Sequence, residues 1–226
     1  DVKNKKVYVS IDYYNFCTKS NKIYLLSEMN DVLDYLIGLE LLEASGLVFG
    51  LLAVYFLIKE NILTWPAGIA YVLVSFVIFG KEKLYGDFAL HVVFLILNIY
   101  GWWFWAKDAR KADPEVPIST YPLNIKLALW IVSIAGIFIT GLLLSKSDAS
   151  LPYWDSATTV LSLTGMWLTA RKKIENWHFW LVVDVLATGI YFYKGIYFYA
   201  LLYLIYIGMA IAGFRAWKKT MDSQNT

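Results

Sequence analysis

Asp184 is the residue whose type and position most clearly indicate a chemical role, because its carboxylate lies in the middle of a long apolar segment. A charged group at the centre of a membrane helix costs about 2.5–3.5 kcal/mol, so it should face protein or a water-filled cavity. Successive spacings of 3, 4, 4 and 3 connect Trp177, Trp180, Asp184, Thr188 and Tyr191, which places all five side chains on one helix face. Aromatic rings beside a carboxylate favour a flat or cationic ligand, through stacking and cation–π attraction.

Other apolar segments carry polar or aromatic residues at similar helical spacings. Their hydroxyl, amide and carboxylate groups suit a sugar or an amide. No Lys or Arg lies deep in any segment, and a phosphate would need such a cationic partner, so we expect an unphosphorylated ring compound as the ligand. The substrate-binding residues predicted from these faces are Asp184, Trp180, Trp177, Thr188, Tyr191, Asn98, Phe94, His91, Asp87, Thr158, Ser162 and Tyr203.

The same polar faces have a simpler interpretation, in which they only join neighbouring helices through hydrogen bonds. Trp102, Trp103, Trp105 and Trp217 fit this interpretation, because aromatic residues collect at membrane–water interfaces. It explains Asp184 poorly, because that residue lies near the centre of its segment.

The sequence offers little for catalysis. It has no Cys/His metal cluster, no nucleophile–base pair and no phosphate-binding loop of the pattern G-x-x-x-x-G-K-[ST]. The single cysteine, Cys17, cannot form an internal disulfide, and a net charge of +2 is too small to suggest nucleic-acid binding. We therefore expect neither an enzyme nor a bound cofactor or metal ion.

The elements that must position these residues are apolar helices. The 226-residue chain is 59% hydrophobic and 17% charged, with a mean hydropathy of +0.53, whereas soluble domains are about half apolar and a quarter charged. Its apolar runs are long enough to cross a bilayer as helices. We predict an all-α membrane protein with seven transmembrane helices, at residues 36–58, 62–80, 84–106, 125–144, 153–170, 177–194 and 196–216. A polar segment, residues 1–35 with a possible amphipathic helix, precedes them.

An internal repeat organises these helices. Shifting the chain by 112 positions aligns Trp65 with Trp177 and Gly101 with Gly213, and it also aligns Trp105 with Trp217. We predict two parallel three-helix repeats, residues 36–106 and 153–219, joined by a linker and a fourth helix in residues 107–152; residues 220–226 form a tail. This three-one-three layout is typical of transporters, whose substrate sites lie near the bilayer midplane between the repeats.

Basic residues near the helix ends indicate the orientation. Near the spans they are concentrated on the side that holds the C-terminus, including Arg171, Lys172, Lys173 and Arg215. Cytoplasmic loops carry the excess of Lys and Arg, so we predict a cytoplasmic C-terminus and an N-terminus outside.

Both repeats contain groups of aromatic, glycine and polar residues that together form a specific pattern. In the first repeat they are Trp65-Pro66, Leu84-Tyr85-Gly86-Asp87, Tyr100-Gly101-Trp102-Trp103 and Trp105. In the second they are Glu175-Asn176-Trp177, Trp180, Asp184, Tyr191, Lys194-Gly195-Ile196-Tyr197, Ala200, Tyr203, Gly213 and Trp217. These motifs resemble those of the PnuC family of bacterial nicotinamide riboside transporters, and the second repeat resembles the family more closely. The resemblance covers roughly residues 36–219.

The resemblance implies facilitated diffusion of nicotinamide riboside across the bacterial inner membrane, followed by trapping through a cytoplasmic riboside kinase. It also implies the fold of the SWEET sugar transporters and a homotrimer. Met166 stands where we associate the family with a polar residue such as Gln. Related Pnu-type proteins carry thiamine or riboflavin, so another flat vitamin is the alternative substrate. A membrane enzyme or scaffold without transport activity is the second alternative.

Overall fold

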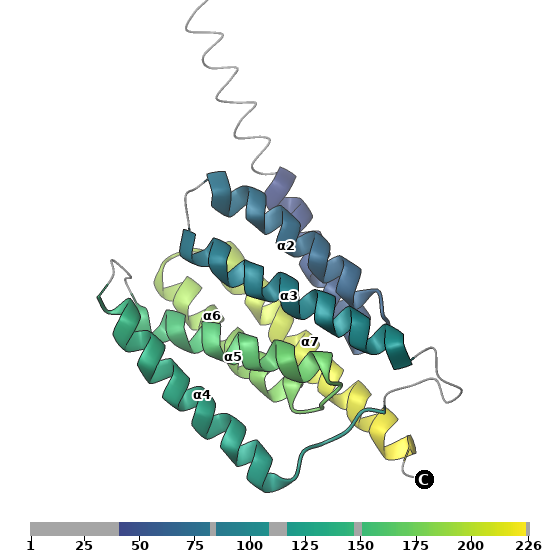
Figure 1. Ribbon diagram of the computed structural model, residues 1–226. Coiled ribbons are helices and arrows are strands. Elements are labelled where there is room, and N and C mark those ends of the chain that lie inside the picture. The colour runs from purple at the N-terminus through teal and green to yellow at the C-terminus, as the bar shows by residue number, and fades with distance from the viewer. Residues whose placement is uncertain (1–40, 82–84, 109–116, 147–150, 225–226) are drawn as a thin grey trace, which may run out of the picture. The chain divides into compact units, whose positions relative to one another are not determined.

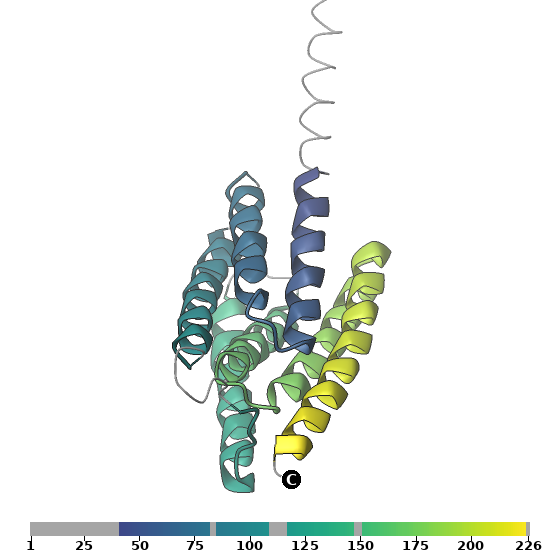
Figure 2. The ribbon, with the colours of Figure 1, turned by 90° about the vertical axis from the view of Figure 1, so that its right-hand side faces the viewer.

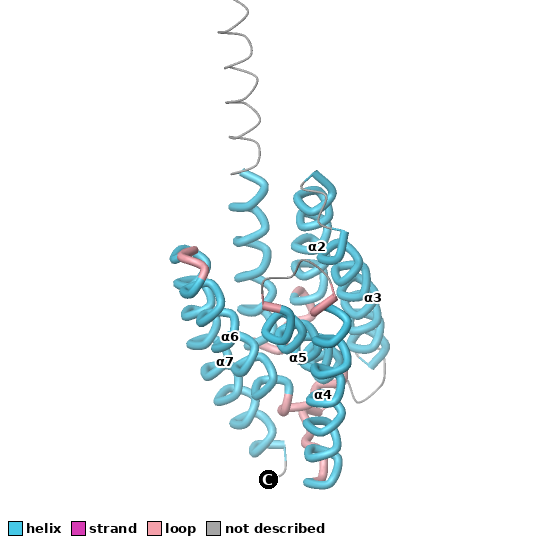
Figure 3. The backbone as a smooth tube through the Cα atoms, turned by 90° about the vertical axis from the view of Figure 1, so that its left-hand side faces the viewer, coloured by secondary structure: helices cyan, strands magenta, loops and turns pink. Residues whose placement is uncertain are grey.

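The structure, a computed structural model, describes residues 41–81, 85–108, 117–146 and 151–224. Seven helices fill these residues: Leu41–Ile58, α2 (Thr64–Lys81), α3 (Tyr85–Asp108), α4 (Leu123–Leu144), α5 (Pro152–Ala170), α6 (Asn176–Tyr193) and α7 (Tyr197–Gln224) (Figure 1). The described part contains no strand, and short loops join most of the helices (Figure 3). The predicted all-helical fold is therefore confirmed. The predicted amphipathic helix and Cys17 lie outside the described residues.

The described residues from Gly46 onward belong to one compact unit, which contains α2 to α7. Most helix boundaries lie within a few residues of those predicted. The exception is α7, which continues to Gln224, beyond the predicted end at residue 216. Its last turns are polar, so hydropathy alone gave no reason to extend it.

Four of the described helices are long and apolar enough to cross a membrane: Leu41–Ile58, Phe88–Lys107, Leu123–Leu144 and Tyr199–Gln224. The apolar helix Thr64–Gly80 is shorter. In contrast, α5 and α6 bury polar side chains such as Ser156, Ser162 and Asp184.

The two repeats have matching tryptophan packing. In the first repeat, Trp65 lies against Gly101 and meets Trp105 edge to face, with ring centroids 5.3 Å apart. In the second, Trp177 lies against Gly213 and meets Trp217 in the same way at 5.5 Å. A methyl group at either glycine would collide with the tryptophan ring, so each ring needs a glycine beneath it.

Each repeat is also hydrogen-bonded to the other. The Trp105 indole donates to the Ala170 carbonyl at 3.2 Å, and the Trp217 indole donates to the Leu57 carbonyl at 2.9 Å. Figure 2 shows residues 46–58 running beside α7, where the second of these bonds lies. These residues belong to one buried apolar cluster that contains all four tryptophans.

The fourth helix packs on the second repeat. Trp130 of α4 stacks on Phe179 of α6 with ring centroids 4.3 Å apart, and Ser156 of α5 donates to the Ile137 carbonyl of α4. Its outer face leaves apolar side chains such as Ile131 and Val132 exposed, as expected for a helix that faces lipid.

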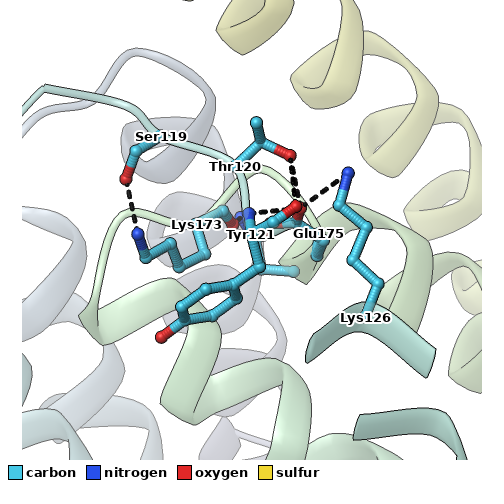
Figure 4. A network of polar contacts seen from close by, with 7 residues as sticks. Ser119, Thr120, Tyr121, Lys126, Lys173 and Glu175 are labelled. Atoms are coloured by element: carbon cyan, nitrogen blue, oxygen red, sulfur yellow. Dashed lines mark hydrogen bonds and ion pairs between the residues drawn. The ribbon is translucent and has the colours of Figure 1, made fainter. Parts of the chain in front are cut away.

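The chain before α4 is attached to the turn between α5 and α6 (Figure 4). Ser119 pairs with Lys173 in a parallel β-bridge. The buried Glu175 carboxylate accepts hydrogen bonds from Thr120 Oγ1 at 2.6 Å and Tyr121 N at 2.9 Å, and lies 3.1 Å from Lys126 Nζ. Burial opposes ionisation of Glu175, but these donors outweigh it, so its pKa lies below the ordinary value.

Candidate functional site

A cavity of about 240 Å³ lies among residues 50–57 and helices α2, α3, α5, α6 and α7. Both repeats contribute to its wall, which is mainly apolar and aromatic. The lining residues are Gly50, Ala53, Val54, Leu57, Thr64, Trp65, Gly68, Tyr71, Val72, Phe94, Asn98, Ser162, Met166, Thr169, Trp177, Trp180, Val183, Asp184, Tyr203, Tyr206 and Ala210.

Asp184 supplies the carboxylate of this wall. Its side chain is buried, with 6% relative exposure. Its carboxylate accepts no hydrogen bond and forms no ion pair within the part of the chain that the structure describes. No described Lys or Arg lines the cavity either. An ionised carboxylate in this position needs a cationic partner, which the described wall does not supply, so a cationic ligand would favour the charged form of Asp184.

The Trp180 indole beside Asp184 is held in a fixed orientation. Its Nε1 donates to Thr169 Oγ1 at 3.1 Å, and that hydroxyl donates to the Gly165 carbonyl at 2.9 Å. Gly165 also lets the ring approach α5, because a methyl group there would lie 3.3 Å from the Trp180 ring. One aromatic wall of the cavity is therefore rigid before any ligand enters.

The first repeat contributes an amide to the cavity. Asn98 donates through Nδ2 to the Phe94 carbonyl at 2.9 Å, and its Oδ1 lies against Gly68 of α2. The Asn98 side chain is buried, with 3% relative exposure. Any larger residue at position 68 would run into this carboxamide, so Gly68 is required for its placement.

Two indole N–H groups of the cavity wall lack partners. Nε1 of Trp65 and Nε1 of Trp177 are buried, and neither has a hydrogen-bond acceptor among the described residues. An unsatisfied buried donor costs about 1–3 kcal/mol, and here the same cost occurs at equivalent positions of both repeats. Both nitrogen atoms are enclosed by protein, so this cost belongs to the packed tryptophan cluster and not to the cavity surface.

The structure brings together many of the predicted site residues, but not all of them. The cavity is lined by Asp184, Trp177, Trp180, Asn98, Phe94, Ser162 and Tyr203. His91 is instead packed among aromatic rings, with ring centroids 4.7 Å from Phe79 and 5.4 Å from Phe94.

Three other predicted residues lie outside the cavity wall. Thr188 donates to the Asp184 backbone carbonyl at 2.7 Å, and Thr158 bonds to the carbonyls of its own helix. The Tyr191 ring stacks on the ring of Tyr203, a lining residue, with ring centroids 5.4 Å apart. Asp87 belongs to α3, but its side chain lies outside the described part.

Sequence reasoning did not include several lining residues, notably Trp65, Gly68, Tyr71 and Tyr206. The internal repeat could have identified two of these residues, because each is equivalent to a predicted site residue. Trp65 is the equivalent of Trp177, and Tyr206 is the equivalent of Phe94. Tyr71 had no such signal, because its equivalent is an ordinary apolar residue.

Comparison of the sequence with known proteins identifies the family of this chain. The model of the family "Nicotinamide mononucleotide transporter" matches residues 40–219. The nicotinamide riboside transporter PnuC of Escherichia coli (strain K12) is 29% identical over 201 residues, covering 78% of this chain and 84% of its own. The riboflavin/roseoflavin transporter RibM of Streptomyces davaonensis is 27% identical over 187 residues, covering 77% and 83%.

A solved structure shows the same fold. The crystal structure of the vitamin B3 transporter PnuC superimposes with a TM-score of 0.65 at 23% identity, covering 80% of this chain and 82% of the other. Because the family model covers most of the chain, the protein belongs to the nicotinamide mononucleotide transporter family, and it is a multi-pass membrane transporter rather than an enzyme.

Proposed function

We propose that the protein carries nicotinamide riboside across the membrane by facilitated diffusion. The observation that carries this proposal is the buried Asp184 carboxylate, which has no cationic partner among the described residues and lies beside the fixed Trp180 ring. Nicotinamide riboside contains a flat pyridinium cation. It therefore supplies both the missing charge and a surface for stacking.

The remaining polar groups of the wall suit the rest of this molecule. Asn98 and Ser162 can exchange hydrogen bonds with ribose hydroxyls or with the carboxamide. Met166 adds an apolar patch where we associate the family with a polar residue.

Phosphorylated forms should be excluded. The described cavity wall has no Lys or Arg to neutralise a phosphate, and Asp184 would repel one. The family model is named for the mononucleotide and one relative for the riboside, so the two ligands are the informative comparison.

Riboflavin is the second candidate, because RibM is also a relative. Its isoalloxazine ring is flat but uncharged, so it would stack on Trp180 and leave the Asp184 charge unpaired. This reasoning favours the pyridinium ligand.

Calorimetry on the purified protein tests the proposal. Nicotinamide riboside should bind saturably, whereas its mononucleotide and riboflavin should bind at least about tenfold more weakly, a difference of about 1.4 kcal/mol. Thiamine also contains a flat cationic ring, so its affinity relative to the riboside tests the identity of the vitamin. Equal affinity for riboside and mononucleotide would contradict the charge argument. Uptake of labelled riboside into liposomes without ATP or an ion gradient then tests facilitated diffusion, with protein-free liposomes as the control.

The proposal includes import, because phosphorylation by a cytoplasmic riboside kinase would convert the riboside to a form that the cavity excludes. It also includes a homotrimer in the bacterial inner membrane with a cytoplasmic C-terminus. Light scattering of the detergent-solubilised protein would test the trimer. Labelling of cysteines introduced at the C-terminus in intact cells would test the orientation.

A further inference from the structure

Glu60 and Lys172 occupy equivalent positions in the two repeats, 112 residues apart. Both have left-handed backbone conformations, with φ of 54° and 48°. The adjoining helix ends match as well: Asn61 N donates to the Phe56 carbonyl at 2.9 Å, and Lys173 N donates to the Leu168 carbonyl at 2.9 Å. Glycine usually fills such a position, because it avoids the strain that a side chain incurs. Two charged side chains at these positions therefore call for another explanation.

The two side chains meet each other across the repeats. Lys172 Nζ lies 3.9 Å from Glu60 Oε2, and the two side chains have relative exposures of 7% and 17%. The same ammonium lies 4.7 Å from the centroid of the Trp105 ring. The ion pair therefore joins the end of the first helix of one repeat to the end of the first helix of the other.

This pair adjoins the tryptophan cluster at one end of the cavity. Trp65 and Trp177 line the cavity. Trp105 and Trp217 pack behind them and donate their indole protons to the opposite repeat. A solute that entered or left at this end would have to separate the repeats here. Movement of one repeat against the other is also how repeat-built transporters alternate their access.

We propose that Glu60 and Lys172 form a latch that holds the tryptophan end of the cavity closed. When the repeats part at this end, the ion pair breaks and the cavity opens. This proposal rests on the proposed function only because transport requires a solute to pass through this end of the cavity. The accessibility of the cavity itself can be measured without any substrate.

The swapped pair gives the sharpest test. Because the two positions have the same backbone conformation and are related by the repeat, exchanging the charges should restore the pair, with the ammonium then near Trp217. The experiment uses Cys17→Ser as a cysteine-free background, since Cys17 is the single cysteine, and Ser162→Cys on the cavity wall as the reporter. The labelling rate by a membrane-impermeant methanethiosulfonate reagent is measured on right-side-out and on inverted membrane vesicles, so that the reagent approaches from the tryptophan end in one of the two preparations.

In Glu60→Gln and in Lys172→Gln, labelling should be about five-fold faster than in the background that keeps both charges. This is the factor that corresponds to the strongest solvent-exposed ion pairs. The double variant Glu60→Lys/Lys172→Glu should return to within about two-fold of the background. Lys126→Gln is the matched control: it breaks a 3.1 Å ion pair with Glu175, neither member of which lines the cavity, and it should leave the rate unchanged.

Unchanged labelling in both single variants would overturn the latch, and so would a double variant that labels as fast as the singles. Size-exclusion profiles show that each variant remains folded when it is labelled. If riboside binding fails but the labelling pattern holds, the proposed substrate is wrong and the latch stands. If binding succeeds but labelling does not change, the latch is wrong and the substrate stands.

Discussion

Trp105 and Trp217 lie 112 positions apart in the chain, and their ring centroids are 6.4 Å apart in the structure. They are equivalent residues of the two repeats, so an approximate two-fold axis passes between them. Each donates its indole proton to the first helix of the opposite repeat, at Ala170 and Leu57. Contacts made in one repeat therefore have counterparts in the other.

The places where this symmetry fails are the informative ones. Asp184 has Val72 as its equivalent, and Trp180 has Gly68. In the other direction, Asn98 has Ala210 as its equivalent. All six residues line the cavity. Asp184 and Trp180 thus belong to the second repeat and Asn98 to the first, which suits a ligand with a cationic ring at one end and polar groups at the other.

Replacing Asp184 with Asn should reduce the affinity for nicotinamide riboside by about tenfold or more, because the change removes the charge that faces the pyridinium, worth at least about 1.4 kcal/mol. Thermal stability should stay the same or rise, since a buried unpaired carboxylate is lost. Calorimetry and thermal unfolding measure the two effects. Asp155→Asn is the matched control, because Asp155 lies in the first turn of α5 and does not line the cavity. Equal loss of affinity in both variants would contradict a specific role for Asp184.

Replacing Trp65 or Trp177 with Phe should destabilise the protein less than Trp105→Phe, because neither indole N–H has an acceptor among the described residues that the change would remove. The Trp105 indole donates to the Ala170 carbonyl, so Trp105→Phe loses a hydrogen bond worth about 0.5–1.5 kcal/mol in addition to ring contact. Melting temperatures in detergent measure the difference. An equal loss of stability in all three variants would contradict the distinction between paired and unpaired indoles.

Replacing Gly101 with Ala should destabilise the protein by about 1–3 kcal/mol, because the added methyl group collides with the Trp65 ring. Gly213→Ala should behave alike through Trp177. Gly189→Ala is the control within a helix: nothing lies within 4 Å of the added methyl group, so it should stabilise α6 by about 0.5–1 kcal/mol. Melting temperatures in detergent distinguish these cases. A neutral Gly101→Ala would mean that the Trp65 ring is free to move.

The sequence predicted the helices and the repeat well, because both depend on strong periodic signals. It predicted the cavity only in part. Helical spacing places Thr188 and Trp180 on one face with Asp184, but it does not show which of them lines the cavity. The Thr188 hydroxyl instead donates to the Asp184 backbone carbonyl within its own helix. His91 follows the same pattern and is instead enclosed by Phe79 and Phe94. Such outcomes depend on how helices cross, and spacing along one helix carries no information about that.

The Glu175 network makes a prediction about pH. Hydrogen bonds from Thr120 and Tyr121 and the nearby Lys126 lower the pKa of the Glu175 carboxyl in the folded protein, although burial opposes this. A folded-state pKa below the unfolded value means that Glu175 stabilises the fold above its ordinary pKa, and that this contribution is lost as the pH falls through the folded value. Glu175→Gln should therefore lower the melting temperature at neutral pH, and the difference from the unmodified protein should shrink as the pH falls below about 4. Lys126→Gln should cost less, because the two hydrogen bonds to Glu175 remain. A difference that stays constant with pH would show that the network stabilises the protein through packing and not through the carboxylate charge.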